Sequence, residues 1–386
     1  MSRGPRAATL VLLVGAMIAI AAVAATAHSG PAATAAGARP LVTGVSRPAP
    51  PRADSFISLW PACACGRTTV LAQFALADGH RLRTLAKLTG TAGGQVAAPH
   101  ASSGGPVWLT FSSGPRCSSP VAGCGPVADS CTGSTLRYDP GSRRATTVLT
   151  TPPGTLVSDA VPSPDGRRLA MVSADCAGSF MNFHIVVRDL RSGRTWAIGA
   201  DARRCHTLSS VAWSANGSEL VFPFGGSRLS RHGRYPAGVC PVPRFSRLAV
   251  VSATRPSGPG SWKLISADPG CSYMAAAFAG PGLVAVEGCA AGAPRGAGPS
   301  PDLGNADLVI LDARHRITAR FPLARGYNDG ALATNPRTGT VLVSEYQAAN
   351  QGTPVHDWVW ALHGGRLRLV ARYPNRDAPT VIAEPW

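Results

Sequence analysis

The stretch that decides the fold is Ser163-Pro-Asp-Gly-Arg-Arg-Leu-Ala-Met-Val-Ser173, which joins a polar turn to an apolar strand. A second stretch, Ser214-Ala-Asn-Gly-Ser-Glu-Leu-Val-Phe222, repeats the same order of residue types. The Asp-Gly and Asn-Gly pairs supply the positive φ angles that tight hairpin turns need. Each stretch follows a short apolar strand, residues 157–161 or 209–213. The two copies therefore predict a repeated hairpin.

Two more strands follow the first hairpin, and this four-strand pattern recurs along the chain. The two strands after the first hairpin are residues 183–189 and 195–198, joined by a turn at 191–194. The copies are spaced roughly 50 to 60 residues apart, a period that is typical of a β-propeller. A β-sandwich, the alternative all-β fold, has about 100 residues and no such period. The strands expected in the other copies are 95–99, 107–111, 135–138 and 146–149; 275–278, 283–287, 307–312 and 317–321; and 331–334, 341–345, 358–362 and 367–372.

The two ends of this repeated region complement each other. The first unit has only three expected strands, at 56–60, 69–75 and 82–88, and the last unit is followed by a surplus strand at 379–383. A C-terminal strand that completes the first blade closes the ring and leaves no open edge. We therefore predict an all-β fold, a single β-propeller of about six four-stranded blades over residues 55–386. Seven blades are the alternative count, because the unit at 208–265 is long.

The Ser163–Ser173 and Ser214–Phe222 stretches resemble the WD40-like (PD40) repeats of secreted bacterial TolB-type β-propellers. The resemblance covers about a quarter of the repeated region. It implies an extracytoplasmic protein that acts through contacts with other proteins. The fifth and sixth units depart from the repeat, since they carry Ala279-Gly-Pro-Gly282 and Asn335-Pro-Arg-Thr-Gly339 at the turn. That departure bears on the number of blades rather than on the fold class.

The composition agrees with a turn-rich chain and argues against nucleic-acid binding. The 43 glycines and 34 prolines make up about a fifth of the 386 residues, well above the roughly 12% of an average protein. The formal net charge is +17, but Lys87 and Lys263 are the only lysines and the arginines are scattered. Clustered basic charge is the mark of nucleic-acid binding. We therefore predict no nucleic-acid partner.

The amino terminus predicts export. Arg3 and Arg6 precede an uncharged run at 9–27 that ends in Ala25-Thr26-Ala27, the three-part pattern of a secretory signal. We assign residues 1–27 to a signal peptide or, alternatively, to an uncleaved signal anchor, which would be the only membrane contact. Residues 28–54 are rich in alanine and proline and are expected to be a disordered linker. Either way the protein is extracytoplasmic, secreted or tethered to the cell membrane.

Ten cysteines fit an exported chain, because an even count in an oxidising compartment favours disulfides. The predicted strand order places all ten at one face of the propeller, eight in the long loops between second and third strands and two, Cys205 and Cys271, in the links between blades. Expected pairs are Cys176 with Cys205, and Cys271 with either Cys240 or Cys289. Metal binding by the closely spaced cysteines is disfavoured, because zinc sites usually have a two-residue gap and a matching second pair. The cysteines whose pairing stays open are Cys63, Cys65, Cys117, Cys124 and Cys131.

The search for catalytic chemistry finds no serine-hydrolase, phosphate-loop, dinucleotide or calcium-loop motif. We predict no catalytic residue, no metal and no cofactor. Acidic and aromatic side chains at strand ends near the cysteine-bearing loops are the candidate binding residues, although such acids also pair with arginine in ordinary structural roles. They are Asp175, Tyr273, Glu287, Glu345 and Tyr346.

From these observations we predict a non-enzymatic extracytoplasmic scaffold that binds an envelope or extracellular protein, or a glycan, through its disulfide-linked loop face. The alternative is a propeller enzyme, a lyase or hydrolase, that acts on cell-wall or extracellular polysaccharide. A purely structural ectodomain on a membrane anchor is a third interpretation. The convergence of two or three acids and a histidine would favour the enzyme.

Overall fold

The computed structural model describes residues 41–44, 55–60, 69–89, 94–97, 105–113, 132–175, 183–199, 204–208, 210–228, 247–290, 303–325, 327–335, 338–347, 356–374 and 381–385. All of them belong to one compact unit, Arg39–Trp386. Its elements are β-strands apart from one 3-10 turn, Pro259–Ser261, which confirms the all-β prediction for these residues. In the described part of the chain, no helix has the length and apolar character needed to span a membrane.

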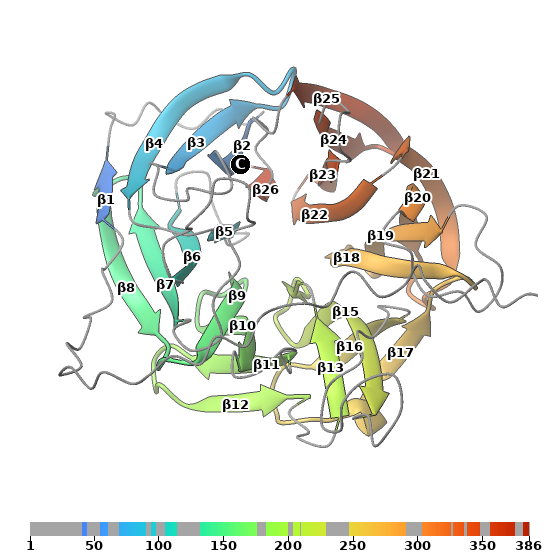
Figure 1. Ribbon diagram of the computed structural model, residues 1–386, viewed down its shortest axis with the longest axis horizontal. Helices are drawn as coiled ribbons and strands as arrows, with labels where there is room; N and C mark the ends of the chain where they lie inside the picture. The colour runs from blue at the N-terminus through green and yellow to red at the C-terminus, as the bar shows by residue number, and fades with distance from the viewer. Residues whose placement is uncertain are drawn as a thin grey trace, which may run out of the picture. The chain divides into compact units, whose positions relative to one another are not determined.

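The first sheet combines strands from both ends of the chain (Figure 1). The C-terminal strand β26 pairs antiparallel with β2, the first strand of the repeated region. At the other edge, β1 pairs with β4, although we had assigned its residues to the linker. In spatial order the strands are β26 (Val381–Pro385), β2 (Ser55–Trp60), β3 (Thr69–Ala75), β4 (Arg81–Thr89) and β1 (Leu41–Gly44).

The second sheet holds eight strands in two antiparallel groups of four, which one parallel pairing between Thr132 and Thr155 joins. The first group is β5 (Gly94–Ala97), β6 (Val107–Ser113), β7 (Thr132–Asp139) and β8 (Arg144–Thr150). The second group is β9 (Thr155–Pro162), β10 (Arg168–Asp175), β11 (Phe183–Asp189) and β12 (Thr195–Ile198).

The third sheet differs from expectation at its first strand. We expected one strand over 209–213, but β15 (Glu219–Arg228) pairs with two short strands, β13 (Arg204–Leu208) and β14 (Ala212–Trp213). The sheet continues through β16 (Arg247–Ser252) and β17 (Lys263–Ser266).

The last two sheets are regular four-stranded antiparallel meanders, as the repeats predict. The fourth sheet is β18 (Cys271–Ala279), β19 (Gly282–Ala290), β20 (Leu303–Leu311) and β21 (Ile317–Arg325). The fifth is β22 (Tyr327–Asn335), β23 (Thr340–Gln347), β24 (His356–His363) and β25 (Arg366–Pro374).

The two hairpin turns that decided the fold have the same hydrogen bonds. The Ser163 hydroxyl donates to Asp165 Oδ1 at 2.5 Å and accepts from the Arg168 amide at 2.9 Å. The Ser214 hydroxyl likewise lies 2.8 Å from Asn216 Oδ1 and accepts from the Glu219 amide at 2.9 Å. The glycine of each turn has positive φ, +66° or +68°, where an L-residue is strained. The shared chemistry of Ser-x-Asp/Asn-Gly therefore builds both turns.

Hydrophobic clusters fill the space between successive groups of strands. On β19, Leu283 and Ala285 pack with residues of the third sheet, whereas Val284 and Val286 pack with residues of the fifth. Successive side chains of a strand point to opposite faces, so a strand covered on both faces needs a continuous apolar run. Full burial of one such large side chain contributes about 1.5 to 3 kcal/mol. The apolar runs of the sequence therefore mark strands packed between two neighbouring sheets.

Candidate functional site

Among the described residues, the largest group of charged side chains in contact lies at the fourth sheet, on the face that packs against the third sheet. Glu287 of β19 is directly opposite Tyr273 of β18 on one side and Asp307 of β20 on the other. Arg320 comes from β21, and Asp268 from the link between β17 and β18. We call these five residues the Arg320 cluster.

Arg320 binds three carboxylates. Its Nη1 atom lies 2.5 Å from Glu287 Oε2 and 3.6 Å from Asp307 Oδ2, and its Nη2 atom lies 2.5 Å from Asp268 Oδ2. The Glu287 side chain is 0% exposed, whereas Arg320 is 33%, Asp307 32% and Asp268 58% exposed. The cluster thus has one fully buried acid, with two acids and a guanidinium that solvent reaches.

Glu287 is held at both oxygens. Besides the bond from Arg320, its Oε1 accepts a hydrogen bond from the Asp268 amide at 3.1 Å. A buried carboxylate is tolerated only when it is paired and hydrogen-bonded. Burial by itself lowers the pKa of Arg320, but the hydrogen bond to Glu287 and the charges of the three carboxylates outweigh it and raise that pKa. The guanidinium therefore stays charged.

Tyr273 forms the buried wall of the Arg320 cluster. Its hydroxyl donates to the backbone oxygen of Ser266 at 3.4 Å, and its side chain packs in the core between the third and fourth sheets. Burial first, and then the charges of Glu287 and Asp268, raise the pKa of this phenol. Tyr273 is therefore a neutral hydrogen-bond donor.

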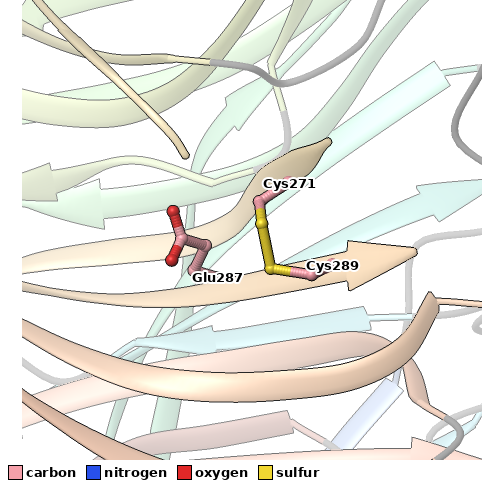
Figure 2. Close-up of side chains that lie close together, drawn as sticks. All are labelled: Cys271, Glu287 and Cys289. Carbon is pink, nitrogen blue, oxygen red and sulfur yellow. A yellow bond between two sulfur atoms is a disulfide. The ribbon is translucent and has the colours of Figure 1, made fainter. Parts of the chain in front are cut away.

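A disulfide joins Cys271 to Cys289 beside this cluster (Figure 2). The two cysteines face each other across β18 and β19, with a Cα–Cα distance of 4.1 Å. Cys289 is the partner that we predicted as one of two alternatives, and the structure confirms it. Cys205 lies in β13, but the other cysteines and the Cys176–Cys205 pairing lie outside the described residues or side chains.

The structure separates the other acid that we grouped with Glu287. Glu345 occupies the equivalent position on β23, where it is buried and accepts a hydrogen bond from Trp360 Nε1 at 2.6 Å. Val341 and Val343, on the same face of β23, pack with residues of the fourth sheet. Glu287 and Glu345 therefore lie at different sheet junctions. Asp175 ends β10 and Tyr346 lies in β23, but their side chains are outside the described part.

Sequence reasoning missed Arg320, Asp268 and Asp307, and it also missed Asp159 on β9. Asp159 Oδ2 accepts a hydrogen bond from the Val211 amide at 3.1 Å and so links the second sheet to the third. Desolvation raises its pKa to about 6, against smaller opposing contributions from backbone amides. The available signal was one acid inside the apolar stretch Thr155–Pro162.

Replacement of Asp159 with asparagine should flatten the pH dependence of stability. Because the pKa of Asp159 is higher in the folded protein, the folded state binds the proton more tightly. In the parent protein, the free energy of unfolding should therefore fall by about 2 kcal/mol as the pH rises from about 4 to above 6. Asparagine keeps the acceptor for Val211 and does not titrate. Urea unfolding of both proteins at several pH values tests this prediction. An equal dependence of the unfolding free energy on pH in the parent and the variant would contradict it.

Comparisons with known proteins give similarity of structure only. No family model matches the chain, and no curated protein matches it. An oligogalacturonate lyase in complex with manganese has 11% identity and a TM-score of 0.41, over 83% of this chain and 79% of that one. An acylaminoacyl peptidase from Pyrococcus horikoshii has 11% identity and a TM-score of 0.39, over 72% and 39%. The tricorn protease has 12% identity and a TM-score of 0.41, over 88% and 36%.

These matches correct one prediction. This chain spans well under half of either peptidase, and TM-scores below 0.5 assign no activity to it. The similar structures are nevertheless propeller-type proteins and mostly enzymes, a lyase and peptidases. They contradict our prediction of a non-enzymatic scaffold, which rested on a resemblance of two turns. That prediction was wrong, and the enzyme alternative is taken up below as a proposal.

Proposed function

We propose that this chain is a propeller enzyme that acts on polysaccharide, as a lyase or a hydrolase, at the Arg320 cluster. The observation that carries the proposal is the convergence of Asp268, Glu287 and Asp307 on one guanidinium that solvent reaches. Both reactions use such groups. Glycoside hydrolysis needs a pair of carboxylates, and elimination from a uronic acid needs a base beside a cation that holds the sugar carboxylate.

Accessibility assigns the roles within the cluster. Asp268 and Asp307 are the partly exposed acids, so they are the catalytic residues of this proposal. The exposed part of Arg320 contacts the substrate. Glu287 is fully buried, so it acts through Arg320 as a positioning residue.

The test measures turnover by the full chain on uronic-acid polysaccharides and on neutral glucans. New reducing ends report either reaction, and the ultraviolet absorbance of an unsaturated uronic acid reports elimination alone. The double variant Asp268→Asn/Asp307→Asn should lose at least about 100-fold of the activity. Glu219→Gln, which removes an exposed acid on β15, should keep it. No turnover by the parent protein overturns the function, and full activity of the double variant overturns the site.

The proposed architecture is a six-bladed propeller of the TolB-like, WD40-like type that β26 closes. The supporting observation is a ring of contacts between the first strands, in which β26, β5, β9, β14, β18 and β22 each contact the next and β22 contacts β26 (Figure 1). The hydrophobic clusters support the same ring. One of them packs Phe56 and Phe74 of the first sheet against Leu342 and Val359 of the fifth sheet, so the first and last sheets share a core. The two Ser-x-Asp/Asn-Gly turns support the repeat type.

The proposed compartment is extracytoplasmic, and the proposed partner is a glycan of the cell envelope or surroundings. The support is the export pattern of residues 1–27 and the disulfide between Cys271 and Cys289, a bond that persists in oxidising compartments. Sequencing of the mature amino terminus distinguishes a cleaved signal, which begins the chain at His28, from a retained anchor.

A further inference from the structure

Cys271, Cys289 and Glu287 form a group with the composition of a metal site. One ligand atom of each residue lies within 4.8 Å of those of the other two, and this is the only such group of three found in the described part of the chain. Figure 2 shows the Glu287 carboxylate beside the disulfide, on the same pair of strands. Glu287 and Cys289 are two residues apart on β19, so they share one face of the sheet.

We propose that reduction of the Cys271–Cys289 disulfide creates a Zn²⁺ site with Glu287 as the third ligand. A dithiol supplies two electrons and two protons, which break the S–S bond and leave two thiols, and the dithiol itself becomes a disulfide. When Zn²⁺ binds, each thiol releases its proton to solvent and a Zn–S bond forms. The oxidised pair has no thiolate, so metal binding and the disulfide exclude each other.

The ligand set and its spacing suit zinc. Zinc binds thiolate sulfur at about 2.3 Å and carboxylate oxygen at about 2.0 to 2.2 Å in a tetrahedron, which places neighbouring ligand atoms about 3.5 to 3.8 Å apart. The three ligand atoms already lie within 4.8 Å, so modest side-chain rotation on a rigid two-stranded frame brings them to that spacing. Two sulfurs and one oxygen also favour zinc over magnesium or calcium, which prefer oxygen ligands.

The surroundings of Glu287 supply the outer hydrogen bonds that metal-ligating carboxylates need. The Arg320 guanidinium and the Asp268 amide each donate to one Glu287 oxygen, and a carboxylate has about four lone-pair positions. Two thiolates, Glu287 and Zn²⁺ sum to one negative charge, and Arg320 is the cation that contacts Glu287, although it also pairs with Asp268 and Asp307. Glu287 is buried while both cysteines are half-buried. Water is the fourth ligand of this proposal, since zinc sites of this kind are four-coordinate.

The first experiment uses the full-length parent chain and mass spectrometry. The protein is reduced with a phosphine, because dithiols themselves bind zinc, and is then alkylated with and without Zn²⁺. Peptide mapping measures the alkylation rate at each cysteine. We expect Zn²⁺ to slow alkylation of Cys271 and Cys289 at least about tenfold. Equal rates with and without Zn²⁺ at these two cysteines would overturn the proposal.

The second experiment identifies the oxygen ligand. Zn²⁺ affinity of the reduced protein is measured by competition with a chromophoric chelator. Glu287→Gln should weaken the site at least about tenfold, because the amide oxygen is neutral, and Cys271→Ser/Cys289→Ser should lose one equivalent of zinc. Glu219→Gln is the matched control and should bind as the parent does. Unchanged affinity in Glu287→Gln would refute the role of the carboxylate. Since the readout is metal binding, its outcome is independent of turnover on polysaccharide.

Discussion

Replacement of Arg320 with methionine is expected to lower the free energy of unfolding by about 3 to 5 kcal/mol. The variant leaves Glu287 fully buried without the guanidinium that binds its Oε2 atom, and an uncompensated buried charge is among the costliest defects in a folded protein. Methionine keeps most of the aliphatic volume, so lost packing is a minor part of the effect. Urea unfolding at neutral pH, followed by tryptophan fluorescence, measures the change.

Two companion variants separate this effect from a general loss of charge. Arg316→Met removes an exposed arginine that pairs with Asp312 just before β21, and it should leave the unfolding midpoint unchanged because exposed ion pairs contribute little. Glu287→Leu combined with Arg320→Met should recover most of the lost stability, since apolar residues can replace a buried ion pair. Equal midpoints for Arg320→Met and Arg316→Met would contradict the buried-charge explanation.

Deletion of residues 379–386, which removes β26, is expected to abolish cooperative folding of the chain. The deletion removes one of the two antiparallel neighbours of β2, leaving only β3, and it removes the contacts that β26 makes with β5 and β22. The unpaired amides and carbonyls of β2 then form an exposed strand edge, which promotes aggregation. The loss of even one strand is large against a total stability of about 5 to 15 kcal/mol.

Thermal unfolding by circular dichroism and size-exclusion chromatography test the deletion. The truncated chain should show a broad transition or aggregate, whereas deletion of Trp386 alone should leave both readouts as in the parent chain. A sharp transition at the parent temperature in the 379–386 deletion would show that β26 does not hold the two ends together. It would also remove the main support for closure of the proposed propeller.

The strands and turns could be predicted because their signals are local. The Ser163 and Ser214 turns carry their own hydrogen-bond partners within five residues, and strands buried on both faces appear as apolar runs. Cys289 was one of two predicted partners of Cys271, because both cysteines are equidistant from the hairpin turn at Gly280, and the structure selected it over Cys240. β13 and β1 were missed, since Arg204–Leu208 and Leu41–Gly44 are short and lack a repeat signal.

The Arg320 cluster could not be predicted, because its members come from separate parts of the chain. Asp268 and Arg320 are 52 residues apart, and Glu287 and Arg320 are 33 apart. Arginine is scattered through the whole sequence, so no single arginine stood out. Their meeting depends on the register of β19, β20 and β21 and on the link that precedes β18.

The sequence by itself determined most of the strands and the turns between them, and it limited the partner of Cys271 to Cys240 or Cys289, because alternation, turn chemistry and hairpin symmetry act over a few residues. Only the tertiary structure decided which charges meet. It buried Glu287 against Arg320, placed Glu345 at another junction and set the disulfide beside a carboxylate. The physical reason is that a buried charge is stable only with a partner, and that partner is supplied by sheet register and packing rather than by neighbours in the chain.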